Sequence, residues 1–153
     1  MPRDYMIKIA LDKFAIAPTR AHPYDAGLDL HTPKDITVPE TRYSEFFEEV
    51  EIGTAIVDTG VHVEIPEGYV GFIKSKSGLN VKHGLVAEGV IDAHYTGSIV
   101  VKLYNYNNEE YFFEAGDKIA QLVILPCLLP ELEIVDSLEE TDRGDAGFGS
   151  TGR

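Results

Sequence analysis

The sequence predicts an all-β fold, either a barrel or a sandwich. Short runs rich in β-branched and aromatic residues follow one another along the chain, at residues 7–11, 60–65, 69–73, 98–106 and 119–125. Glycine, proline and an Asn-Asn pair separate these runs at short intervals, as is typical of all-β proteins. No long stretch of the chain shows the hydrophobic period of a helix.

The individual elements follow from local patterns. Residues 7–11 and 60–65 alternate between apolar and polar side chains, so each predicts a strand with one buried face. The second of these runs ends in a Pro-Glu-Gly turn at residues 66–68. Residues 89–97 predict a hairpin with Asp92, His94 and Tyr95 at its tip.

One short helix is expected between residues 77 and 84. Ser77 is suited to cap its first turn, residues 78–82 form little more than one turn, and Gly84 is suited to close it. The residues just before it, Ser75 and Lys76, place hydroxyl and ammonium groups beside the N-terminal amides. Such an arrangement predicts either an anion site or an ordinary helix cap.

The composition limits the class of protein. With 153 residues the chain is expected to form one domain, large enough to bury a core without disulfides. Cys127 is the sole cysteine, which suits a reducing compartment. The net charge of −13 argues against a nucleic-acid partner, and no apolar run is long enough to span a membrane. The N-terminus has no signal-peptide pattern, so a cytoplasmic protein is expected, or a nuclear one if the source is eukaryotic.

Three segments carry candidate polar groups. Strand alternation at residues 24–30 places Asp25, Gly27 and Asp29 on one face, which suits either contact with a hydrated Mg²⁺ or a solvated strand. Asp92 follows an apolar pair, and we expect its carboxylate to be partly shielded and able to act as a base for a water molecule. Gln121 lies in an otherwise apolar strand, so its amide either holds neighbouring backbone or reaches a ligand.

The tail is rich in glycine, with the sequence Arg-Gly-Asp-Ala-Gly-Phe-Gly-Ser-Thr-Gly at residues 143–152. Arg143, Ser150 and Thr151 offer donors for phosphate oxygens, and Phe148 offers a flat surface for a base. A P-loop is excluded because Gly149 stands where that motif needs lysine. The tail is therefore either an arm that becomes ordered when a nucleotide binds or a disordered terminus.

These five segments have the order and the residues of the five motifs of the trimeric deoxyuridine triphosphatases. The resemblance extends from about residue 23 to residue 152. It implies a jelly-roll-like (β-clip) subunit in a homotrimer with an exchanged C-terminal arm, so that residues 1–141 form the β domain and residues 142–153 the arm. It also implies hydrolysis of dUTP to dUMP and pyrophosphate with Mg²⁺ as cofactor, which keeps uracil out of DNA and supplies dUMP for dTMP synthesis. A bacterial or phage source fits this family.

The resemblance also assigns roles to residues. Asp92 would activate the water that attacks the α-phosphorus, Tyr95 would exclude a 2′-hydroxyl, and Asp29 would hold a water molecule on Mg²⁺. Backbone from residue 86 to residue 91 would read the uracil edge, and Phe148 would stack on the base. The full set of expected substrate-binding residues is Lys76, Ser77, Gly78, Val90, Ile91, Tyr95, Gln121, Arg143, Phe148, Gly149, Ser150 and Thr151.

Two departures from the family pattern stand out. Lys76 occupies a position that is usually arginine, and lysine lacks the planar fork that clamps a phosphate with two hydrogen bonds. Residues 40–51 form an acidic, aromatic extension outside all five motifs. It is expected to be a solvated loop or hairpin, with binding of a regulatory protein as the alternative.

A related activity, deamination of dCTP, is not expected. Deaminases of this superfamily have a catalytic glutamate on the strand after the hairpin, and Lys102 occupies that position here. A pure binding module is the alternative from another class of function.

Overall fold

The computed structural model describes residues 6–147, and in that part of the chain it confirms an all-β fold with one short helix. The strands are β1 (Lys8–Leu11), β2 (Gly27–His31), β3 (Ile36–Val38), β4 (Arg42–Ser44), β5 (Glu49–Glu51), β6 (Gly53–Asp58), β7 (Val61–Glu64), β8 (Tyr69–Lys74), β9 (Leu85–Ile91), β10 (Val100–Asn105), β11 (Tyr111–Phe113) and β12 (Lys118–Pro126). The helix is α1 (Ser77–His83).

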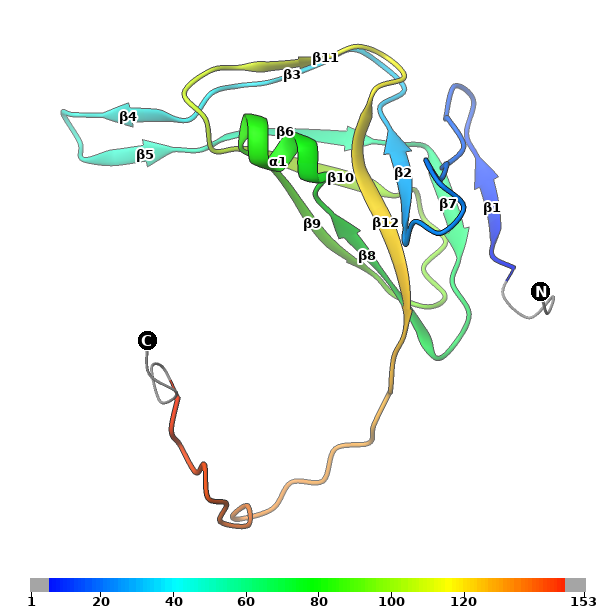
Figure 1. The fold of residues 1–153 in the computed structure, drawn as a ribbon, viewed down its shortest axis with the longest axis vertical. Helices are drawn as coiled ribbons and strands as arrows, with labels where there is room; N and C mark the ends of the chain where they lie inside the picture. Colours follow the sequence, from blue (N-terminus) through cyan, green and yellow to red (C-terminus); the bar gives the residue numbers. More distant parts are fainter. Residues whose placement is uncertain (1–5, 148–153) are drawn as a thin grey trace.

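A six-stranded sheet in the order β2-β12-β8-β9-β10-β6 forms the body of the molecule. Three two-stranded sheets accompany it, β1-β7, β11-β3 and β4-β5, and every strand pair is antiparallel. Apart from the β4-β5 pair, the sheets curl around a common interior, with α1 lying beside β9 (Figure 1). This arrangement confirms the all-β, jelly-roll-like fold that is expected from the sequence.

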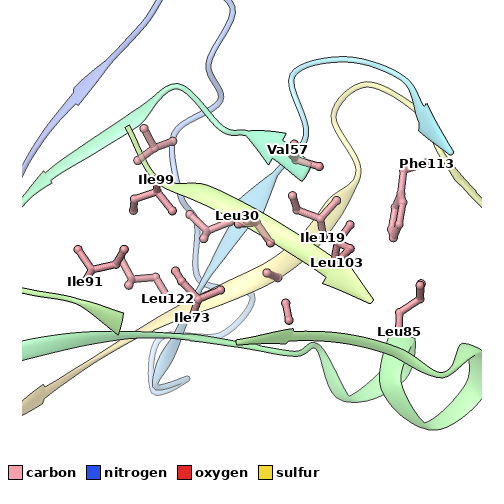
Figure 2. Packing of buried hydrophobic residues seen from close by; sticks show 14 of the residues in the cluster. Leu30, Val57, Ile73, Leu85, Ile91, Ile99, Leu103, Phe113, Ile119 and Leu122 are labelled. Carbon is pink, nitrogen blue, oxygen red and sulfur yellow. The ribbon is translucent and has the colours of Figure 1, made fainter. Parts of the chain in front are cut away.

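The core is built by strand alternation. In β7, Val61 and Val63 are buried while His62 and Glu64 face outward, and in β10 the same holds for Val101 and Leu103. Figure 2 shows how side chains from opposite sides of the curl meet. The labelled members of this cluster are Leu30, Val57, Ile73, Leu85, Ile91, Ile99, Leu103, Phe113, Ile119 and Leu122.

The helix agrees with the expected position but not with the expected cap. Lys76, with φ −79° and ψ 130°, is the N-cap, and no side chain caps the first turn. The prediction of a Ser77 cap is therefore wrong, because the chain leaves β8 in an extended conformation for two residues and Ser77 is already helical. Gly84 closes the helix at φ 65°, in the left-handed conformation that glycine adopts without a steric penalty.

The start of β2 also differs from the prediction. The strand begins at Gly27, so Asp25 is not on the same strand face as Asp29. Asp25 instead stabilises a turn, because its Oδ2 accepts a hydrogen bond from the backbone N–H of His22 at 2.9 Å. Of these two acids, Asp29 therefore lies on strand β2 and Asp25 lies in the turn before it.

Two segments extend away from the body in Figure 1. Strands β4 and β5 form a hairpin, which confirms the expected hairpin extension at residues 40–51. After β12 ends at Pro126, residues 127–147 run outward without regular strands or helices. The predicted boundary between residues 141 and 142 lies within this segment and stays a prediction. No helix among residues 6–147 is long and apolar enough to cross a membrane.

Candidate functional site

A buried carboxylate between two lysines forms the first half of the candidate site. Asp29 is only 4% exposed, and it lies on the face of β2 opposite the buried Leu30. Lys76 Nζ donates a hydrogen bond to Asp29 Oδ1, and Lys118 Nζ lies 2.7 Å from Asp29 Oδ2. Burial by itself would raise the pKa of the Asp29 carboxyl, but the two ammonium groups outweigh it and hold that pKa below its usual value. Asp29 is therefore ionised at neutral pH.

A β-bulge places Lys118 in this cluster. The register between β12 and β2 shifts between Lys118 and Ala120, and the consecutive residues Ile119 and Ala120 are both buried in the core. In a regular strand the two would point to opposite faces. The irregularity therefore turns Lys118 onto the face of Asp29, which is a common use of bulges.

Gln121 organises the backbone beside this cluster. It is the cross-strand partner of both Asp29 and Lys74, at the centre of the row that joins β2, β12 and β8. Its Nε2 donates to the carbonyl oxygen of Ser75 at 2.9 Å. The Gln121 amide thus holds the backbone that leads into α1, as the first of its two expected roles requires, and its contact with a ligand stays a prediction.

Ser77 and Gly78 open the helix next to Lys76. Both are exposed, and the first N–H groups of a helix have no intrahelical acceptor. Nothing lies within 4 Å of the position that a Cβ on Gly78 would take. The first turn of α1 is therefore exposed at Ser77 and Gly78, directly after Lys76.

The second half of the site is the turn after β9. Asp92 is exposed in the single chain, so the expectation of a partly shielded carboxylate is wrong for one subunit alone. The Asp92 carbonyl accepts the N–H of Tyr95 at 3.2 Å, and Tyr95 Oη donates to the carbonyl of Ser98 at 3.0 Å. Val90 is 58% exposed on the outer face of β9, whereas the side chain of Ile91 packs in the core and leaves only its backbone for a ligand.

One chain does not bring the two halves together. In the antiparallel register, Lys74 of β8 pairs with Glu88 and Gly71 pairs with Ile91, so Asp92 and Lys76 lie at opposite ends of the strand pair. Asp29 lies on β2, which is two strands from β8 and three strands from β9, because the sheet order is β2-β12-β8-β9. With a rise of about 3.3 Å per residue and about 4.8 Å between strands, Asp92 lies about 20 Å from both Lys76 and Asp29. A single subunit therefore carries two separate half-sites.

The tail residues lie apart from both halves or outside the described chain. Arg143 is exposed, and its Nε donates to the carbonyl of Ala146 at 3.2 Å within a local turn. The predicted contacts of Phe148, Gly149, Ser150 and Thr151 lie outside residues 6–147, which the structure describes.

Two further residues, Lys118 and His31, belong to the first cluster and were not expected from the sequence. His31 follows Asp29 by two residues and is 8% exposed, and its Nδ1 is buried without a hydrogen-bond partner. Burial lowers the pKa of this imidazole and both lysines add to that effect, although Asp29 acts in the opposite direction. Alternation in β2 gives a signal for His31, whereas no local pattern gives one for the bulge at Lys118.

The described residues do not form a cage for a resident metal ion. Among residues 6–147 no group of three or more His, Cys, Asp or Glu side chains is close enough to hold one. Both oxygens of Asp29 face ammonium groups instead. An Mg²⁺ ion at this cluster would therefore have to be held mainly by phosphate oxygens and water, as is common for Mg²⁺.

Comparisons with known proteins agree with this geometry. A deoxyuridine 5′-triphosphate nucleotidohydrolase of Rattus norvegicus is 39% identical over 146 residues, which is 95% of this chain and 66% of the rat protein. The dUTPase of Staphylococcus bacteriophage 80alpha, solved with dUPNHPP, superposes with a TM-score of 0.83 at 32% identity, covering 97% of this chain and 99% of that one. It is described as one of the phage dUTPases that control transfer of virulence genes by a G protein-like mechanism.

A second similar phage structure contains a magnesium ion. The dUTPase variant of phage phi11 of S. aureus, described with a structural Mg(II) ion, superposes with a TM-score of 0.74 at 29% identity, covering 88% of this chain and 99% of that one. The family model for dUTPase matches residues 13–152 of the present chain, nearly its whole length. Two half-sites on a curled antiparallel fold, together with this match, show that the chain belongs to the dUTPase family.

Proposed function

We propose that this protein hydrolyses dUTP to dUMP and pyrophosphate. The observation that carries the proposal is the division of the site, with an exposed carboxylate and tyrosine at one end of the β8-β9 pair and a lysine-lined anion site at the other. Hydrolysis of dUTP would keep uracil out of DNA and supply dUMP for dTMP synthesis.

We propose further that the enzyme is a homotrimer with exchanged arms. Two half-sites about 20 Å apart can act on one nucleotide only if different subunits bring them together. The segment between β12 and the arm supports this assembly because its apolar side chains are exposed in one subunit, with Leu128 92%, Leu132 91% and Ile134 98% exposed. Exposed apolar residues in such a number mark a surface that a partner covers.

In the proposed mechanism Asp92 accepts a proton from the water that attacks the α-phosphorus, and pyrophosphate leaves. Lys76, the N–H groups of Ser77 and Gly78, and the backbone fixed by Gln121 would bind the phosphate oxygens. Asp29 would hold Mg²⁺ through a water molecule, and the metal ion would supply positive charge that offsets the negative charge of the triphosphate.

Selectivity would come from the second half-site. The Tyr95 ring would lie under the deoxyribose and leave no room for a 2′-hydroxyl. The backbone of Val90 and Ile91 would contribute to reading the uracil edge, which suits an outward Val90 side chain and a buried Ile91 side chain. Phe148, Gly149, Ser150, Thr151 and Arg143 would close over base and phosphates and exclude bulk water.

Product analysis tests this proposal. Purified protein is incubated with Mg²⁺ and, separately, dUTP, UTP, dTTP and dCTP, alongside the Asp92→Asn variant. We expect dUMP and pyrophosphate from dUTP alone, and no product with Asp92→Asn because the amide cannot accept the proton. Absence of dUTP turnover by the native chain would overturn the proposal, and a uracil product from dCTP would indicate deaminase activity.

We propose as a second role that the β4-β5 hairpin binds a regulatory protein. Phe46 is 96% and Phe47 75% exposed at the hairpin tip, and Glu45, Glu48 and Glu49 surround them. The expected partner is therefore a protein with an apolar groove and a basic rim. Recovery of the same proteins by the intact chain and by one lacking residues 41–50 would refute this role.

A further inference from the structure

The sequence motifs assign no role to Lys118. The structure nevertheless places Lys118 beside Asp29 by an irregularity in strand β12. The bulge between Lys118 and Ala120 costs β12 a regular pair with β2. Its effect is to bury Ile119 and Ala120 side by side and to turn Lys118 toward Asp29. A bulge that re-aims one charged side chain beside a binding site is the first observation.

The second observation is the supply of hydrogen-bond donors. Each lysine ammonium carries three N–H donors, and Asp29 engages each ammonium through a different carboxylate oxygen. The Lys118 side chain remains 42% exposed and the Lys76 side chain 27%, so both ammonium groups can still reach a ligand. One carboxylate between two ammonium groups leaves a local charge of about +1 in a protein whose net charge is −13.

We infer that Lys118 is a phosphate-binding residue and that Asp29 is the positioning residue that holds Lys118 and Lys76 as a pair. The ligand is the phosphate chain of a nucleoside triphosphate, a choice that rests on the proposed function. Lys118 comes from β12 and Lys76 is the N-cap of α1, and among residues 6–147 both ammonium groups contact the carboxylate of Asp29. The pair supplies separate ammonium groups to a phosphate chain, where one arginine would supply a single planar fork.

Binding of inorganic tripolyphosphate in EDTA tests the inference without a metal ion and without hydrolysis. Titration calorimetry at fixed ionic strength compares the native protein with Lys118→Met, Lys118→Arg and the charge-matched control Lys34→Met. Because hydrogen bonds between charged groups are strong, we expect Lys118→Met to weaken binding about tenfold. Lys118→Arg should recover most of the loss, and the exposed Lys34→Met should stay within about twofold.

The Asp29→Asn variant separates positioning from simple electrostatics. Removing a negative charge makes the cluster more positive, so charge alone predicts tighter binding of tripolyphosphate. If Asp29 positions the two ammonium groups, binding becomes weaker instead, and it does so in EDTA, where no metal-bound water is involved. Tighter or unchanged binding by Asp29→Asn would overturn the positioning role.

Further outcomes keep the inference distinct from the proposed function. Native affinity in both Lys118→Met and Lys118→Arg, or no binding of tripolyphosphate by the native trimer, would overturn it. Native binding of tripolyphosphate with no turnover of dUTP would refute the proposed hydrolysis but not the lysine pair. Should Lys118→Met fail to fold, the double variant Asp29→Asn/Lys118→Gln removes the pair without leaving a buried unpaired charge, and it should bind as weakly as we expect for Lys118→Met.

Discussion

The ring of Tyr95 lies directly over Gly97, two residues further along the turn. A Cβ on Gly97 would fall 2.5 Å from Tyr95 Oη and 2.6 Å from the ring carbon that bears it. Gly97 does not have a left-handed φ, so the backbone conformation does not require glycine here. The missing side chain instead leaves room for the Tyr95 ring. The placement of Tyr95 therefore depends on glycine at position 97.

Gly97→Ala should consequently reduce sugar selectivity. The added methyl group must push the Tyr95 ring from its hydrogen bond with the carbonyl of Ser98, which is 3.0 Å from Tyr95 Oη. We expect kcat/KM for dUTP to fall about tenfold, and the ratio of dUTP to UTP turnover to fall as well, because a misplacement of about 1 Å is costly in a positioned site. Steady-state kinetics with both nucleotides measures this, and an unchanged ratio would show that Tyr95 is not the sugar filter.

His62 should make stability depend on pH through the same turn. Its Nδ1 donates to the carbonyl of Thr96 at 2.7 Å, and its Nε2 lies 3.2 Å from Asp12 Oδ1. The hydrogen bond to Thr96 and the nearby Asp12 and Asp58 carboxylates raise the pKa of His62 above its usual value. A raised pKa means that the folded protein holds this proton more tightly than the unfolded chain.

The stabilisation by His62 is therefore complete below about pH 6.5, the pKa in an unfolded chain, and is lost as the pH rises through the folded pKa. We expect the difference in free energy of unfolding between native protein and His62→Gln to be larger at low than at high pH. Urea titrations at a fixed protomer concentration between about pH 5.5 and about pH 8.5 measure it. A difference that grows with rising pH would contradict the assignment.

Lys76→Arg should strengthen substrate binding. A guanidinium at this position can donate to Asp29 and still present parallel N–H groups to a phosphate, which one ammonium cannot do. We expect KM for dUTP to fall several-fold, on the order of threefold to tenfold, with little change in kcat.

The matched control for this change is Lys74→Arg, since Lys74 at the end of β8 pairs with the exposed Glu88 of β9 at 2.7 Å. Its KM should stay close to the native value. A KM for Lys76→Arg that is unchanged or raised would show that a lysine suits this site as well as an arginine.

Local pattern predicts much of this fold, for identifiable reasons. Alternation of buried and exposed residues identifies β7 and β10, and Gly84 identifies the end of α1 because its φ of 65° is a conformation that other residues avoid. The three-residue strands β3 and β11 have no such signal. They exist because they pair with each other across a separation of about seventy residues, and a local window does not contain that pairing.

The candidate site also has a part that local sequence predicts and a part that depends on strand pairing. Asp29, Asp92 and Tyr95 are found from the motifs because their residue types and spacing are visible along the chain. The ion pair between Lys118 and Asp29 is not, because it depends on a bulge in the register of β12 against β2. The exposure of Asp92 also differs from the prediction, because only Ile91 of the preceding apolar pair packs in the core, while Val90 and the Asp92 carboxylate face solvent.

The β4-β5 hairpin should be dispensable for folding. Among the described elements, its two strands pack mainly against each other. The paired residues Tyr43 and Val50 are 63% and 61% exposed. Arg42 and Glu51 are directly paired, so a two-residue Asn-Gly turn can join Thr41 to Ile52 after the hairpin is removed. Thr41 is kept because its hydroxyl donates to the carbonyl of Asn105 at 2.6 Å.

We expect this shortened protein to match the native free energy of unfolding within about 1 kcal/mol, because surface changes that remove no buried contact have small effects. Leu103→Ala provides the contrast: Leu103 is 1% exposed in the core, and its truncation should cost about 2–5 kcal/mol. Turnover of dUTP by the shortened protein should also stay at the native level, since the hairpin lies outside both half-sites. A loss of stability comparable to that of Leu103→Ala would instead make the hairpin part of the folded unit, and the surface that it covers would have to be sought in the proposed trimer.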